Sequence, residues 1–190
     1  MKQNAKILEM KLQGASQDTK LQGASSSNYH FAVYKHRLIT KDGQQLSRLF
    51  IVIKDSDNDI VAFTDFHLYA RGHARGRRLS EDGNKRSSFV CVFLNYIYNE
   101  RGVSKLNDIT IDMLQDFLTL YGTGKLGHYD NTRTKETTMQ CYIYVVDFLK
   151  NYIKKNPDCC LSLKDFIRKK PVQTKNGQLV YRDVPSVNFV

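Results

Sequence analysis

Lysine and arginine carry the clearest chemical signal in this sequence. Its 190 residues hold 29 of them against 19 acidic residues, which gives a formal net charge of +10. The surplus lies in two blocks, because residues 71–86 contain six bases and two acids and residues 150–175 contain eight bases and two acids. Clustered positive charge is what a phosphate-binding surface needs. The two blocks therefore predict a polyanionic partner, with nucleic acid as the first candidate.

Other kinds of site chemistry find little support. Asp55, Asp57 and Asp59 stand at positions 1, 3 and 5 of a calcium-binding loop, but position 6 is Ile60 rather than glycine and position 12 is Phe66 rather than glutamate, which favours a plain hairpin turn. The sequence has no nucleophile-elbow, P-loop or zinc-protease motif, and its five histidines lack ligand spacing. We therefore expect no metal and no cofactor.

Cysteine usage and hydropathy indicate a globular protein in a reducing compartment. The four cysteines, at positions 91, 141, 159 and 160, form no C-x-x-C pair, so we expect reduced thiols. No segment approaches the roughly 18 uninterrupted apolar residues of a membrane span. The N-terminus also differs from a signal peptide, because its short apolar patch holds charged residues. We expect no membrane association and a cytoplasmic location.

The elements that would position the basic residues begin with a small β region. Residues 1–30 contain the near-repeat KLQGASQDT and KLQGASSS and are poor in large apolar groups, which predicts a flexible tail. Segments 31–40 and 46–54 flank an Asp-Gly pair and predict a β-hairpin. A third strand at 60–62 and a short helix capped by Thr64 follow.

From residue 80 the hydrophobic period becomes helical. The pattern predicts a first helix that ends at Gly102, a second that Thr110 caps, and a third from about 134 to 155. Ser162, with Asp165 three residues later, predicts a short fourth helix that Pro171 ends. The predicted fold is therefore mainly α, a four-helix bundle with a small N-terminal antiparallel β element.

The predicted organisation has four parts. Residues 1–30 are the tail, 31–72 the β-hairpin or three-strand region with its short helix, 73–170 the helical domain, and 171–190 an extended linker. Because no terminating element follows the linker, we expect the natural protein to continue beyond Val190.

Four stretches carry a family pattern: RRLSEDGNKRSSFVCVFLNYIYNERGV, LNDITIDMLQDFLTLYG, TKETTMQCYIYVVDFLKNYIKKNP and LSLKDFI. A serine near the first helix start, Phe-Leu pairs with an aromatic neighbour, an Ile-Thr helix start and a threonine in the third helix recur in them. The matching residues are Ser80, Phe93, Leu94, Tyr96, Ile109, Thr110, Ile111, Phe117, Leu118, Thr137 or Thr138, Phe148 and Leu149. The pattern resembles the SAM-like core-binding domain of tyrosine recombinases, the integrases of phages and transposons.

The resemblance implies that this chain clamps crossover-site DNA during integration and recombination, in a bacterial cell or phage-infected host. The family's catalytic half, with its tyrosine nucleophile, lies C-terminal to this region and has no match in the sequence, so the chain alone should not cut DNA. The implied partners are double-stranded DNA and the protein's own catalytic domain. We expect a monomer in solution, with oligomers on DNA for a full-length protein.

The resemblance also implies which segments face DNA: the 71–86 loop, the start of the third helix and the fourth helix. Hydroxyl and backbone N–H groups at a helix start can add phosphate contacts to those of basic side chains. The predicted DNA-binding residues are Arg71, Arg75, Arg77, Arg78, Lys85, Arg86, Arg133, Thr134, Lys135, Thr137, Lys154, Lys155, Lys164, Arg168, Lys169 and Lys170.

Three alternatives stay open at this point. The chain could be another nucleic-acid-binding helical module, such as a transcription regulator with an N-terminal sheet. It could be a helical protein-interaction module that is merely basic, or an enzyme whose site the motifs do not reveal. Salt-dependent DNA binding separates the nucleic-acid binders from the interaction module.

Overall fold

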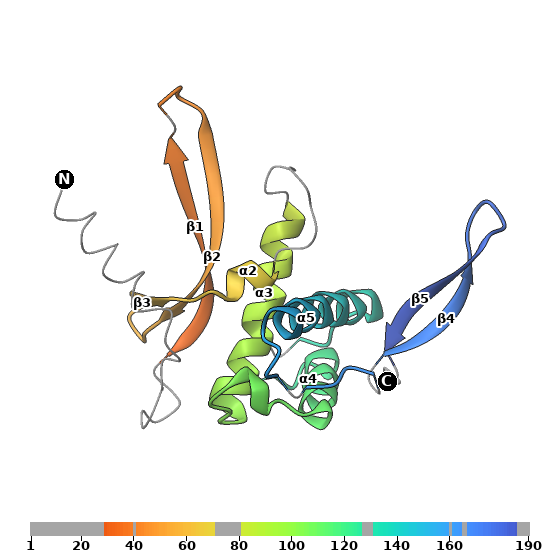
Figure 1. Cartoon of the computed structure of the whole chain (residues 1–190). Coiled ribbons are helices and arrows are strands. Elements are labelled where there is room, and N and C mark those ends of the chain that lie inside the picture. Colours follow the sequence, from red (N-terminus) through yellow and green to blue (C-terminus); the bar gives the residue numbers. More distant parts are fainter. Residues whose placement is uncertain are drawn as a thin grey trace.

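The structure, a computed structural model, combines helices with two small antiparallel sheets (Figure 1). It describes residues 29–39, 41–70, 81–126, 131–159, 161–164 and 167–185. Strands make up 25% of it, so the architecture is mixed α/β and the predicted mainly-α four-helix bundle is wrong. Nearly all of the predicted tail, and the predicted domain boundary near residue 72, lie outside the described residues.

The first sheet confirms the predicted hairpin and third strand. Strands β1 (His30–Ile39) and β2 (Gln45–Lys54) pair antiparallel, and β3 (Ile60–Phe63) adds to β2, giving the order β1-β2-β3. Gly43 supports the β1–β2 turn with a φ of +73°, which a side chain would disfavour. Alternation and turn chemistry were therefore sufficient to predict this sheet.

The turn between β2 and β3 is held by its first aspartate. The Asp55 carboxylate accepts hydrogen bonds from the backbone N–H of Asp57 at 3.0 Å and of Asp59 at 2.9 Å. An aspartate that bonds its own following backbone is typical of tight turns. This geometry agrees with the interpretation of the acidic segment as a hairpin turn. In the described part of the chain, no group of three or more His, Cys, Asp or Glu residues is placed to hold a metal ion.

Two helical elements follow the sheet. The short α2 (Phe66–Ala70) leads into residues outside the described set, and α3 (Glu81–Asn95) continues directly as the π-helix η2 (Tyr96–Glu100). The predicted stop at Gly102 is confirmed, because this residue has a φ of +64°. A single 3₁₀ turn, η3 (Leu106–Asp108), then connects to the next helix.

The second and third predicted helices are confirmed with their caps. In α4 (Ile111–Thr123), the Thr110 side chain accepts from a first-turn backbone N–H, and Gly124 closes the helix with a φ of +69°. In α5 (Lys135–Lys155), Thr134 plays the same capping role. Both helices begin where their capping threonine supplies an acceptor that the first turn lacks.

The core lies between α3, α4 and α5, with the first sheet and α2 against it. Phe93 and Phe117 pack edge to face at 5.1 Å between ring centroids, and Phe148 packs against Phe66 of α2 at 6.0 Å. The fully buried members include Ile51, Val90, Phe93, Leu94, Ile97, Leu114, Phe117, Val145, Phe148 and Leu149. Sheet and helices therefore contribute to one hydrophobic cluster.

Hydrogen bonds from asparagines tie the sheet to the helices. The backbone N–H of Phe31 donates to the Asn95 side chain at 2.6 Å, and the Asn95 amide donates back to the Phe31 carbonyl at 3.1 Å. One π-helical turn later, the Asn99 amide donates to the Tyr29 carbonyl at 2.9 Å. The strand β1 is thus docked on the end of α3 through its own backbone groups.

The predicted fourth helix is wrong, and the segment expected to be a linker from residue 171 is paired in a hairpin as far as residue 185. Residues 161–163 are irregular, and β4 (Ile167–Gln173) pairs antiparallel with β5 (Leu179–Pro185). We call this two-stranded hairpin the ribbon. Figure 1 shows the ribbon projecting from the helices.

Local chemistry explains why this segment forms a hairpin. Pro171 lies on β4, opposite Tyr181 of β5. A proline inside a helix would break the helical hydrogen bonding. Both strands of a two-stranded sheet are edge strands, and edge strands tolerate proline. Gly177, with a φ of +78°, closes the turn after Asn176. The stretch from Ser162 to the proline is also too short to repay helix nucleation without strong packing.

Within the described residues, none of the helices combines the length and the apolar character that a membrane span requires.

Candidate nucleic-acid interface

Helix α5 separates two groups of predicted DNA contacts. Thr134 and Lys135 stand at its start and are exposed, whereas Lys154 and Lys155 stand in its last turn and are also exposed. A 21-residue helix rises 1.5 Å per residue, so about 30 Å separates its two ends. The structure therefore does not bring these two groups together.

The start of α5 has the groups that a phosphate contact would use. The Thr134 hydroxyl oxygen accepts from the Thr137 backbone N–H at 3.2 Å and lies 3.0 Å from the Thr137 hydroxyl. The positive end of the helix dipole adds to the charge of Lys135 at this point. The Thr134 hydroxyl already bonds to Thr137, so a phosphate would contact the remaining hydrogen-bonding capacity of the two hydroxyl groups and the ammonium group of Lys135.

Arg133 is partly buried beside this helix start. Its backbone N–H donates to the Gly122 carbonyl at 3.1 Å, and its guanidinium carbon lies 5.7 Å from the centre of the Tyr121 ring. The residue thus connects the end of α4 to the segment that precedes α5. A packing role accounts for these contacts.

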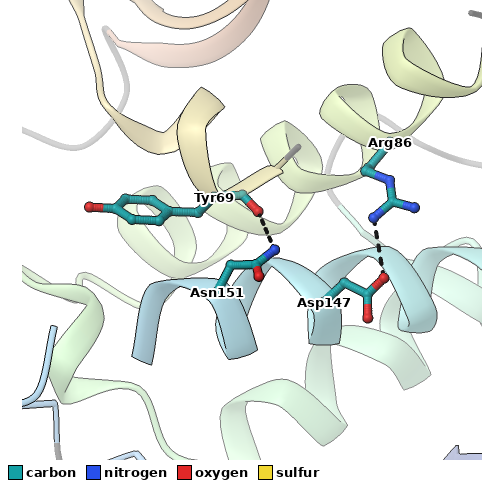
Figure 2. Close-up of polar contacts among 4 residues, drawn as sticks. All are labelled: Tyr69, Arg86, Asp147 and Asn151. Carbon is teal, nitrogen blue, oxygen red and sulfur yellow. Dashed lines mark hydrogen bonds and ion pairs between the residues drawn. The ribbon is translucent and has the colours of Figure 1, made fainter. Parts of the chain in front are cut away.

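Arg86 holds two helices together. Its guanidinium lies 3.2 Å from the Asp147 carboxylate on α5 (Figure 2), and the guanidinium carbon lies 4.6 Å from the centre of the Tyr144 ring. The Arg86 side chain is only 22% exposed. Its charge is therefore compensated within the protein, while the neighbouring Lys85 is exposed to solvent.

The far end of α5 is organised around α2. The Asn151 amide donates to the Tyr69 carbonyl at 3.0 Å (Figure 2), and the Lys155 ammonium lies 5.4 Å from the Tyr69 ring centre. Lysines in a last turn also favour the negative end of the helix dipole. Lys154 and Lys155 thus have a structural explanation that requires no ligand, although both remain exposed.

The second basic block is divided between two places. Arg168, Lys169 and Lys170 are exposed on β4 of the ribbon, not on a helix. Figure 1 shows the ribbon well apart from the end of α5 where Lys154 and Lys155 stand. Lys164, which is exposed, lies in the irregular segment that connects the two.

The first basic block is mostly outside the described residues. Arg71, Arg75, Arg77 and Arg78 fall in the segment 71–80, whose structure is not described, so their placement stays a prediction.

Sequence reasoning missed the ribbon and the residues it adds. Lys175 is exposed in its turn, and Arg182 lies on β5, opposite Lys170 in the backbone register. The signal was present, since an Asn-Gly pair flanked by β-branched residues is typical of a hairpin. The hydrogen bonds of the Asn95 and Asn151 side chains could not be predicted in this way, because no local sequence pattern indicates them.

The described cysteines, Cys91, Cys141 and Cys159, are free and buried. Burial raises the pKa of the Cys91 thiol to about 12 and raises the pKa of Cys141 as well. A buried, neutral thiol is a poor nucleophile and a poor metal ligand. These residues therefore serve the core.

Comparison with known proteins adds no family: no family model, no curated protein and no solved structure matches this chain.

Proposed function

We propose that this chain binds double-stranded DNA as the non-catalytic part of a site-specific tyrosine recombinase. The observation that carries DNA binding is the exposure of basic side chains on α3, at both ends of α5, in the segment that follows α5, and on β4 of the ribbon. Lys85, Lys135, Lys154, Lys164, Arg168, Lys169 and Lys170 are all exposed. Solvent-facing, clustered cations are what phosphate neutralisation requires.

The family part of the proposal is supported by the hydrophobic motif. Phe-Leu pairs recur in the three stretches that form α3, α4 and α5, and all six residues belong to one buried cluster: Phe93, Leu94, Phe117, Leu118, Phe148 and Leu149. The chain would act in the cytoplasm together with a catalytic domain, and the DNA-facing residues would position it on the duplex without cutting.

The proposal is tested by titrating a fluorescent 30-bp duplex with the protein at several salt concentrations. If about six phosphates are neutralised, log K should fall with log salt with a slope near −5, roughly a thousandfold between 50 and 200 mM. A slope near zero, or no binding at low salt, would contradict DNA binding. It would favour the protein-interaction alternative instead.

Two charge-reversed variants sharpen this test. Reversal of Lys154 and Lys155 to glutamate should weaken binding to every duplex by a similar factor, because phosphate contacts carry no base information. Reversal of Lys35 and Arg37, which are exposed on β1, should matter much less, since residues 31–70 carry no net charge. A larger loss from the β1 variant would place the DNA surface on the first sheet.

A further inference from the structure

The ribbon is the part of the molecule whose exposure most needs an explanation. Its strands have seven residues each, and β4 is exposed at four consecutive positions, 168–171. On β5, Leu179 is 63% and Tyr181 68% exposed. A two-stranded hairpin that buries so little is marginally stable in water. A partner that covers one face would supply the missing contacts.

The base of the ribbon is nonetheless anchored. Ile167 packs against the core cluster, and its backbone N–H donates to the Leu163 carbonyl at 3.2 Å. Leu161 and Leu163 are buried just before it. The ribbon is therefore an arm with a fixed root, which projects from the helices in Figure 1.

Charge selects the class of partner. Residues 167–185 contain five basic residues and a single acid, Asp183. The backbone register pairs that acid with Lys169, whereas it sets Lys170 opposite Arg182. This excess of positive charge favours a polyanionic partner.

The alternation along β4 places two cations on one face. Arg168 and Lys170 are two residues apart, so they share a face of the strand, and both are exposed. Lys169 lies on the opposite face, across from Asp183 in the register. One face of β4 therefore carries two exposed cations, Arg168 and Lys170, and the other face carries Lys169.

The dimensions of the ribbon fit duplex DNA. Paired strands lie about 4.8 Å apart, and a strand of this length extends about 20 Å. The major groove of B-DNA is about 12 Å wide and admits a two-stranded ribbon, and arginine and lysine are the side chains that read guanine there. We propose that β4 and β5 form a DNA-binding arm that enters the major groove with the face carrying Arg168 and Lys170. This inference rests on the DNA-binding function proposed above.

The test compares two matched double variants of the full chain. Arg168→Gln with Lys170→Gln removes two cations spaced i, i+2 on an exposed strand. Lys35→Gln with Arg37→Gln does the same on β1, where both residues are also exposed. The ribbon variant should lose about tenfold or more in affinity for a mixed-sequence 30-bp duplex, and its salt slope should fall by about 2. The β1 variant should stay within about twofold of the wild type.

A second probe distinguishes the groove from the phosphates. In a duplex made with glucosylated hydroxymethylcytosine, the glucose groups fill the major groove and the phosphate backbone is unchanged. The wild type should bind it about tenfold more weakly than the plain duplex, and the ribbon variant should bind both alike. Lys169→Gln, on the other face of β4, should still bind the glucosylated duplex about tenfold more weakly than the plain duplex. Circular dichroism checks that each variant is folded.

Two outcomes overturn the inference and leave the proposed function intact. They are a ribbon variant that binds as tightly as the β1 variant, and a wild type that binds the glucosylated and plain duplexes equally. Failure of the wild type to bind any duplex would instead overturn the proposed function itself.

Discussion

A basic side chain contributes to a DNA-binding surface only if its charge is available, and Lys85 and Arg86 differ in this respect although they are neighbours. Arg86 is paired with Asp147 at 3.2 Å and lies over the Tyr144 ring, whereas Lys85 is exposed. The ion pair joins residues 61 positions apart in the sequence. Counting charges along the chain therefore overestimates the cations available to a ligand at this point.

Cys91 provides a residue-level prediction about alkaline stability. Burial raises the pKa of its thiol from 9.0 to about 12, so between these values the unfolded chain loses a proton that the folded chain keeps. The free energy of unfolding should then fall as pH rises above about 9, by up to about 1.4 kcal/mol per pH unit. Urea unfolding at pH 8 and pH 10.5 should show a decrease about 2 kcal/mol smaller in Cys91→Ala than in the wild type. Equal decreases in the free energy of unfolding of the two proteins would contradict this prediction.

At the scale of elements, α5 combines a structural and a candidate binding role. Its face carrying Cys141, Val145 and Leu149 is buried against the other helices. Its first turn is capped by Thr134 and exposes Lys135. The same threonine hydroxyl thus stabilises the helix start and lies where a phosphate would bind.

Two substitutions of Thr134 should separate these roles. Thr134→Ala removes the cap and should lower the free energy of unfolding by about 1 kcal/mol, as measured by urea denaturation. Thr134→Asp keeps a capping acceptor and should preserve stability, but its carboxylate would repel phosphate and lower DNA affinity several-fold. Thr134→Ser is the control that should retain both properties. Undiminished affinity in Thr134→Asp would exclude this helix start from the DNA surface.

At the scale of the whole molecule, two tyrosines in very different surroundings bear on the expectation that the chain does not cut DNA. A tyrosine nucleophile needs neighbouring groups that stabilise the charge developing on the phosphate. Tyr96 is buried in the core, and desolvation raises its pKa, so its phenol stays neutral. Tyr181 is exposed on the ribbon, opposite Pro171 in the register. We expect neither of these two residues to act as a nucleophile.

We therefore expect the chain to be silent in cleavage assays. It should neither nick supercoiled plasmid nor form a covalent adduct on a nicked suicide duplex, whereas a type I topoisomerase run in parallel should do so. The assay is denaturing gel electrophoresis of a labelled duplex after incubation with and without magnesium. A protein-linked band with the purified chain would refute the expectation.

Local signals in the sequence were sufficient to determine the helices α4 and α5 and the hairpin β1–β2. Thr110 and Thr134 cap their helices because each supplies an acceptor to the first turn, and Gly43 and Gly124 adopt positive φ values that other residues disfavour. Each of these effects operates within a few residues. Sequence alone can therefore reveal them.

Tertiary structure decided the segment after residue 160 and the partners of the helices. Near Ser162 a helix-start signal competed with Pro171 and the turn at Gly177, and the cross-strand pairing of β4 with β5 decided the outcome. The bonds from Asn95 to Phe31 and from Arg86 to Asp147 span more than 60 residues. Periodicity shows which face of an element is apolar, but it does not show which distant residue that face will meet. For that reason the sequence revealed the basic blocks, and only the folded chain showed that the second block, residues 150–175, is divided between the last turn of α5 and the ribbon.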